Sequence, residues 1–135
     1  MFIGGKAVVK VGSLAKSSVK GVTRKALTNE ELVNKAADKA HRAIEGSGHV
    51  VGTKKHTYAT KLIDRYQKIY GDRGLHLNLY FDDIGYGKGF LDVYDKSNNA
   101  IYDFKFGKTA RMSKAQYYKY SNSFPDATIR VIKRQ

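Results

Sequence analysis

The chain has 135 residues, of which 41% are hydrophobic and 27% charged, a composition that suits one globular domain with a real core rather than two full domains. Its 25 Lys and Arg against 12 Asp and Glu leave a net charge of +13, which favours polyanionic partners such as nucleic acid or an anionic membrane surface. The absence of cysteine excludes disulfides, thiolate zinc sites and cysteine nucleophiles, and no apolar run is long enough to span a bilayer.

The N-terminal part of the chain predicts one helix after an irregular start. Residues 1–24 are rich in Gly, Ser, Lys and Val and lack the apolar core of a secretory signal; they are open to interpretation as a linker, a frayed helix or the cut end of a longer polypeptide. A helix is expected over 27–46, because Thr28 and Glu31 have the spacing of a capping box and Gly46 is a stop signal.

The remaining elements predict an α+β domain. Residues 46–55 are expected to form a flexible glycine-rich connector, followed by a second helix over 56–74. Alternating apolar residues, turn signals and Pro125 then predict strands at 75–83, 90–95, 100–106 and 128–133, a turn at 85–89, and a helix at 112–124. The order α-α-β-β-β-α-β indicates helices packed around a central mixed sheet.

Charged residues interrupt the apolar strand expected at 100–106. Side chains alternate along a strand, so Asp103 and Lys105 share one face with Ile101. The other face is aromatic and is expected to pack against a helix; it comprises Tyr102, Phe104 and Phe106. Asp103 and Lys105 should therefore project together among apolar neighbours that limit access of water.

The preceding strand is expected to bring a second carboxylate to Asp103. If Asp95 opposes Ala100 across the loop KSNN, then Asp92 opposes Asp103, with Cβ atoms roughly 4.5–5.5 Å apart. Facing carboxylates repel, which predicts a raised pKa or a bound cation such as Mg²⁺ or Mn²⁺. The alternative is that both Asp residues protect an edge strand from aggregation, with Lys105 in a surface salt bridge.

The stretch GFLDVYDKSNNAIYDFKFG resembles the core of the restriction-endonuclease-like nucleases, the PD-(D/E)xK superfamily. KAQYYKY resembles the Gln-x-x-x-Tyr element that some members carry on the following helix. Together with the helix HTYATKLIDRYQKIYGDRG, the strands look like the C-terminal toxin domains of bacterial polymorphic toxins of the Rhs and contact-dependent inhibition types. The resemblance covers 46–135 and divides the chain into an N-terminal linker and helical segment, 1–45, and a nuclease domain, 46–135.

The resemblance implies roles for the strand residues. Asp92 and Asp103 would be metal ligands and Lys105 the catalytic lysine, with Mg²⁺ the expected metal and Mn²⁺ or Zn²⁺ as alternatives. Members often supply another acid from the first core helix. Here Thr60 occupies the position where an acid is expected, which leaves Asp64 as the candidate ligand.

Four further polar residues are candidates for the site. His56 could act in proton transfer or bind a substrate phosphate, or could simply cap or pack the helix it begins. Gln116 and Tyr120 share a helical face and, with Lys108, are candidates for contact with nucleic acid; packing in the core or at its rim is the alternative for the tyrosine. The remaining histidines show no metal-ligand spacing and are interpreted as structural: His41, His49 and His76.

These features and the resemblance predict a metal-dependent nuclease; the residues leave DNA and tRNA open as substrates, and only the resemblance to the superfamily favours DNA. By resemblance it would act as an antibacterial toxin, exported within a larger effector, active in the cytoplasm of a target bacterium, and neutralised by an acidic immunity protein. The alternatives are a tRNA-cleaving toxin of the same fold and a non-catalytic basic module that binds nucleic acid. Facing carboxylates favour the enzyme, because they repel phosphate unless a cation intervenes.

Overall fold

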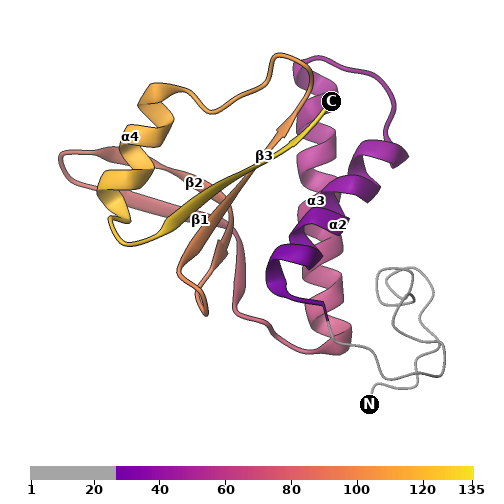
Figure 1. The fold of residues 1–135 in the computed structure, drawn as a ribbon, viewed down its shortest axis with the longest axis horizontal. Helices are drawn as coiled ribbons and strands as arrows, with labels where there is room; N and C mark the ends of the chain where they lie inside the picture. Colours follow the sequence, from indigo (N-terminus) through magenta and orange to yellow (C-terminus); the bar gives the residue numbers. More distant parts are fainter. Residues whose placement is uncertain (1–26) are drawn as a thin grey trace.

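A computed structural model describes residues 27–135, so the expectations for residues 1–26 lie outside the described part of the chain (Figure 1). The elements are α2 (Asn29–Ala43), α3 (His49–Tyr70), β1 (Leu75–Asp83), β2 (Gly87–Asp95), β3 (Ala100–Phe106), α4 (Lys114–Ser123) and β4 (Thr128–Arg134). They follow one another in the predicted order, and the α+β class with a mixed sheet is confirmed.

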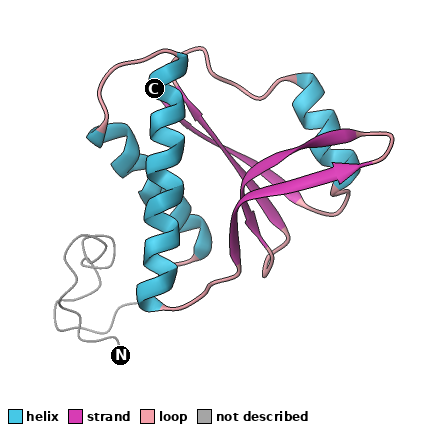
Figure 2. Ribbon diagram, turned by 180° about the vertical axis from the view of Figure 1, so that it is seen from behind, coloured by secondary structure: helices cyan, strands magenta, loops and turns pink. Residues whose placement is uncertain are grey.

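The four strands form one sheet in the order β1-β2-β3-β4. The β1–β2 and β2–β3 pairs are antiparallel, whereas β3 and β4 are parallel and are connected through α4. Helices α2 and α3 lie together at one side of the sheet, and α4 lies at the other, beside the β1–β2 hairpin (Figures 1 and 2). β3 is therefore a central strand.

Two hydrophobic clusters hold the helices to the sheet. The larger one joins α2 and α3 to the aromatic face of β3 and includes Leu32, Val33, Ala59, Ile63, Tyr102, Phe104 and Phe106. The prediction that this face packs against a helix is confirmed. The smaller cluster lies under α4 and consists of Phe81, Leu91, Ile101 and Tyr120.

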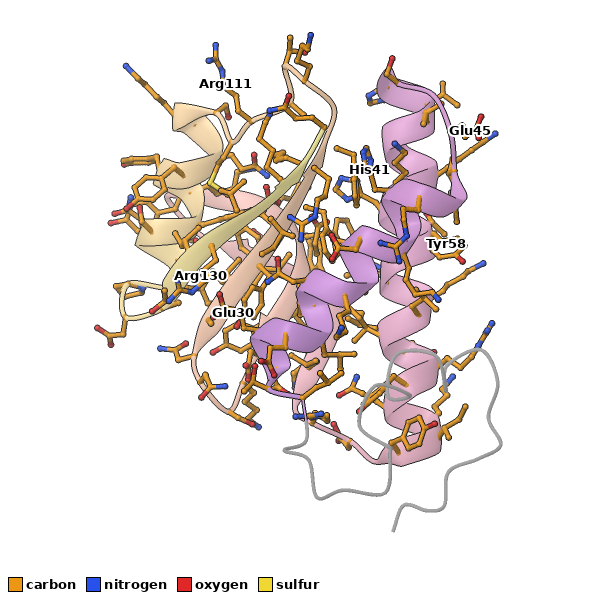
Figure 3. All side chains as sticks on the ribbon, turned by 45° about the vertical axis from the view of Figure 1, so that its right-hand side comes forward. Glu30, His41, Glu45, Tyr58, Arg111 and Arg130 are labelled. Atoms are coloured by element: carbon orange, nitrogen blue, oxygen red, sulfur yellow. The ribbon has the colours of Figure 1, made fainter. Side chains whose placement is uncertain are left out.

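Helix α2 belongs to the same core as the rest of the chain. Its capping box forms as predicted, with Thr28 Oγ1 accepting from the Glu31 N–H at 3.1 Å and the Glu31 side chain accepting from the Thr28 N–H at 2.8 Å. An ion pair of 3.6 Å between Glu30 and Arg130 links the helix to β4 (Figure 3). The helical part of segment 1–45 thus shares its core with segment 46–135.

Helix α3 begins earlier than the sequence predicts. The expected connector at 46–55 is helical from His49 onward, although a glycine such as Gly52 costs a helix interior about 1 kcal/mol. The reason is tertiary: Lys55 is 3% exposed, and its Nζ lies 2.9 Å from His41 Nδ1 and 3.3 Å from the Gly46 carbonyl. These contacts hold the first turns of α3 against the end of α2.

The sheet divides into two arms along β2. This strand pairs with β1 from Gly87 to Asp95, starting three residues before the predicted Phe90, but it pairs with β3 only over Val93–Asp95. On the far side of Val93 from Asp95, the β1–β2 hairpin continues toward α4 without pairing to β3 (Figure 1). Asn78, which lies between the partners of Val93 and Leu91, has a left-handed φ of 52°, a conformation that asparagine tolerates. The resulting fork between β2 and β3 positions the candidate site.

Candidate active site

Asp92 lies at the fork, and its side chain accepts a hydrogen bond from β3 where the backbone pairing of β2 with β3 has ended. Its Oδ2 accepts the backbone N–H of Phe104 at 2.8 Å, where the paired region of β2 and β3 has ended. Its Oδ1 lies 3.4 Å from His56 Nδ1. Asp92 therefore connects β3 to α3, and its carboxylate is held by a backbone group rather than by a flexible side chain alone.

Asp103 and Lys105 project together from β3, as predicted. Lys105 Nζ is 2.8 Å from Asp103 Oδ2, and Asp103 is only 2% exposed. The edge-strand alternative is wrong, because β3 lies between β2 and β4 and this ion pair is not on the surface.

The two strand carboxylates influence each other. The pKa of Asp103 is raised to about 6: burial is the largest cause and the charge of Asp92 adds to it, whereas Lys105 opposes the shift. The ladder stops at Val93, one step before the predicted pairing of Asp92 with Asp103, yet the carboxylates still face the same space. A divalent cation between them would relieve their repulsion.

Helix α4 supplies Gln116 to this pair of strands. The helix begins at the N-cap Ser113, whose Oγ accepts the Gln116 N–H at 3.0 Å. The Gln116 Oε1 accepts from Lys105 Nζ at 3.2 Å, and Nε2 lies 3.4 Å from Asp103 Oδ1 and 2.9 Å from the Tyr120 hydroxyl. Gln116 thus holds both members of the Asp103–Lys105 ion pair.

Tyr120 is a buried side chain of α4. It is 4% exposed, its ring packs edge-to-face with Phe81, and its hydroxyl donates to the Phe90 carbonyl at 3.3 Å. Burial raises its pKa to about 12, so the hydroxyl stays protonated. This burial favours the packing alternative for Tyr120 over direct contact with nucleic acid.

His56 lies at the site on the opposite side from α4. Its ring meets Phe104 and Phe106 edge-to-face at centroid distances of 5.9 and 5.5 Å, and its side chain is 32% exposed. The aromatic face of β3 therefore positions the imidazole beside Asp92. Because α3 begins at His49, His56 lies in the second turn of the helix and does not cap it.

The structure does not bring an acid from α3 to the strand carboxylates. Thr60 is buried and its hydroxyl donates to the carbonyls of its own helix, at His56 and Thr57. Asp64 lies two turns beyond His56 and forms an exposed ion pair of 3.0 Å with Lys68. Asp64 as a third ligand is therefore not supported: within residues 27–135, no three His, Cys, Asp or Glu side chains gather closely enough to hold a metal ion.

A pocket of about 520 Å³ adjoins the site between the start of α3 and the loop after β3. His56 and Lys105 belong to both the pocket and the site, and Lys108, predicted to bind nucleic acid, lies on the pocket wall. Sequence reasoning missed His49, another lining residue, because it shows no metal-ligand spacing and lies within the expected connector. Once α3 starts at 49, the spacing of seven residues places His49 on the same helical face as His56.

Comparisons with known proteins leave the family open: no protein-family model, no curated protein and no solved structure matches this chain. Within residues 27–135, no helix combines the length and the apolar character needed to cross a membrane.

Proposed function

We propose that the chain is a metal-dependent nuclease that hydrolyses phosphodiester bonds through a restriction-endonuclease-like site. One observation carries the proposal: the carboxylates of Asp92 and Asp103 are held at a fork in the sheet, with Lys105 Nζ 2.8 Å from Asp103. A carboxylate pair beside one ammonium is a costly arrangement for a fold to bury unless a ligand uses it.

The residues fit a hard divalent cation. The buried Asp103 carboxylate is contacted by one ammonium, Lys105 Nζ at 2.8 Å, and by Gln116 Nε2 at 3.4 Å, and its pKa is raised by burial and by the charge of Asp92. Mg²⁺ and Mn²⁺ are typically held by one or two protein carboxylates, with water and substrate phosphate completing the shell. Asp92 and Asp103 would hold such an ion, which supplies a Lewis acid for the phosphate and an acidified water when bound.

The protein's own side chains complete the mechanism. The Lys105 ammonium orients an attacking water or neutralises charge that develops on the phosphate, and Gln116 keeps its Nζ in place. His56 can hold a proton at Nδ1 facing Asp92, and its partly exposed ring borders the pocket. The Tyr120 hydroxyl donates to the Phe90 carbonyl, which ties the β1–β2 hairpin to α4 beside these groups.

The charge of the chain points to nucleic acid as substrate. A net charge of +13 favours phosphate contacts regardless of sequence. The charge does not distinguish DNA from tRNA, and DNA is favoured here only by the resemblance to the restriction-endonuclease-like nucleases. As a toxin domain of a larger exported effector, the protein would need an acidic immunity protein in the cell that makes it, and charge complementarity would speed their association. Expression in a bacterium tests this role: wild type should be toxic and Asp103→Ala tolerated.

The deciding experiment incubates purified protein with plasmid DNA and with total tRNA, each in Mg²⁺ and in excess EDTA. Cleavage should require Mg²⁺ and disappear in Asp103→Ala, while Asp126→Ala, which removes an exposed loop carboxylate, should cleave normally. Circular dichroism checks that both variants fold. Cleavage that persists in EDTA or in Asp103→Ala would refute the proposed mechanism.

A further inference from the structure

The pocket beside the candidate active site is lined by two lysines, of which Lys105 is paired with Asp103 behind the lining and Lys108 is not part of that pair. Its charged and titratable residues are Lys105, Lys108, His49 and His56, and none of the residues from 27–135 that line it is acidic. The other lining residues are Phe106 and small residues of the Gly, Ser, Thr and Ala types. A hollow of about 520 Å³ with this lining has room and complementary charge for a phosphate group.

The start of α3 adds hydrogen-bond donors to one wall. Gly48 is the N-cap and makes no side-chain cap, and the first turn contains no acidic residue. The first intrahelical bond is from Gly52 N–H to the Gly48 carbonyl at 2.9 Å, so the preceding N–H groups, including that of His49, have no partner within the helix. Donors at a helix N-terminus favour negative charge.

The opposite wall of the pocket is the loop after β3, and three of its backbone carbonyl groups accept hydrogen bonds from Lys133. Lys133 Nζ binds the carbonyls of Gly107, Lys108 and Ala110 in the loop after β3. These three acceptors are therefore engaged by an ammonium group, and the loop contributes Lys108 to the pocket without free carbonyl oxygens of those residues to repel an anion.

We propose that this pocket binds a phosphate group of the nucleic-acid strand next to the phosphate that is cleaved. Lys105 contributes to both places, because its ion pair with Asp103 lies at the site and its side chain lines the pocket. The assignment of the phosphate to a substrate strand rests on the proposed nuclease function, whereas the anion site itself does not.

A binding experiment tests the anion site without catalysis. Inorganic phosphate is titrated into the full chain in EDTA at constant ionic strength, with chloride as the balancing salt, and backbone amide shifts are followed by NMR. Saturable shifts should centre on Gly48, His49, Gly52, Gly107 and Lys108. The absence of a saturable response in wild type would overturn the proposal.

Two matched pairs of variants locate the binding. His49→Glu places a carboxylate at the first residue of α3 and should abolish the response, whereas His76→Glu makes the same charge change on the exposed part of β1 and should not. Lys108→Ala should weaken phosphate binding roughly tenfold, and Lys61→Ala, on the exposed side of α3, should leave it unchanged. Equal effects within each pair would place the phosphate elsewhere.

A cleavage experiment identifies the source of the phosphate. Neutral methylphosphonates are placed one at a time along an oligonucleotide substrate, and the same substrate is compared with and without terminal phosphates. Wild type should lose at least about tenfold in kcat/KM at one internal position or at one missing terminal phosphate, and Lys108→Ala should lose that sensitivity. An internal effect identifies a diester, and a terminal effect a monoester. If the protein binds phosphate but cleaves no nucleic acid, the proposed nuclease function is wrong and the anion site stands. If it cleaves nucleic acid but does not bind phosphate in the pocket, the anion site is wrong and the nuclease function stands.

Discussion

The hairpin of β2 and β3 holds two buried aspartates in opposite circumstances. At its closed end, the fully buried Asp95 accepts hydrogen bonds from Asn29 Nδ2 at 3.1 Å, Asn98 N at 3.1 Å and Asn98 Nδ2 at 2.7 Å. At its open end, Asp103 faces the Asp92 carboxylate, and its pKa is raised to about 6. The first carboxylate is satisfied by neutral donors, whereas the second is paired with the Lys105 ammonium and is repelled by a neighbouring carboxylate.

We interpret this difference as a structural role for Asp95 and the proposed functional role for Asp103. A buried carboxylate with three donors stabilises the turn that sets the strand register. A buried carboxylate beside another one destabilises the fold at neutral pH and is suited to a ligand that the protein lacks by itself. The two ends of one hairpin should therefore respond in opposite ways to mutation.

The largest effect is expected on catalysis at the open end. Lys105→Ala removes the only ammonium shown to pair with Asp103 among residues 27–135, and should lower kcat by at least about 10³-fold, or about 4 kcal/mol of transition-state stabilisation. Single-turnover cleavage of a defined oligonucleotide measures it. The matched variant Lys61→Ala removes an exposed lysine and should retain full activity; a similar loss in both would show that only overall charge matters.

A slightly smaller effect, on stability, is expected at the closed end. Asp95→Ala leaves the donors of Asn29 and Asn98 without their acceptor and should lower the free energy of unfolding by about 2–4 kcal/mol. Urea unfolding measures this loss. Cleavage per folded molecule should stay near the wild-type level at low temperature, and a selective loss of kcat would contradict the division of roles.

Asp103→Asn should have the opposite sign at neutral pH. Because the folded-state pKa of Asp103 is about 6 against an ordinary 3.8, the native protein binds more protons than the unfolded chain between those values, and stability falls as pH rises through that window. The variant should be more stable than wild type near pH 7, by up to about 3 kcal/mol, and lose this advantage near pH 4.

Urea unfolding in EDTA at both pH values measures the difference, and Mg²⁺ should stabilise wild type more than Asp103→Asn because binding to the native state adds to its stability. A wild-type protein that is more stable than the variant near pH 7 in EDTA would contradict the repulsion between Asp103 and Asp92.

The smallest effect is expected from the helix that supports the site. Gln116→Ala removes the hydrogen bonds to Lys105 and the contact with Asp103 but leaves both strand residues in place. Activity should fall about tenfold, near 1.4 kcal/mol, mainly in kcat. Gln116→Glu should lower it further, since it adds a third carboxylate beside the pair. Unchanged activity in Gln116→Ala would mean that Lys105 needs no support from α4.

The prediction of the hairpin succeeded because it needed only local rules. The loop KSNN placed Asp95 opposite Ala100, and alternation along β3 placed Asp103 with Lys105. The predicted pairing of Asp92 with Asp103 extended the same register by one more residue pair. The backbone ladder ends before that pair, at Val93 and Tyr102, and the Asp92 side chain accepts the Phe104 N–H instead.

The misplaced or missed residues depended on contacts between distant segments. His49 entered the pocket because Lys55 and His41 extend α3 toward its N-terminus, across a connector whose glycines disfavour a helix. Tyr120 became buried because the hairpin folds onto α4, which no periodicity within that helix reveals. Asp64 was assigned by spacing along one helix, but its distance from the strands was set by how α3 packs.

The sequence by itself determined the α+β order, the capped helix α2, the strand faces and the pairing of Asp103 with Lys105, because these follow from periodicity, capping and turn chemistry within short stretches. The tertiary structure alone decided the fork between β2 and β3, the closure of that fork by α4, and the pocket at the start of α3. The reason is physical. The register of the β2–β3 pair follows from the turn and the residues next to it in sequence. The point where the pairing stops depends on a side chain, Asp92, that competes with the backbone for the N–H of Phe104.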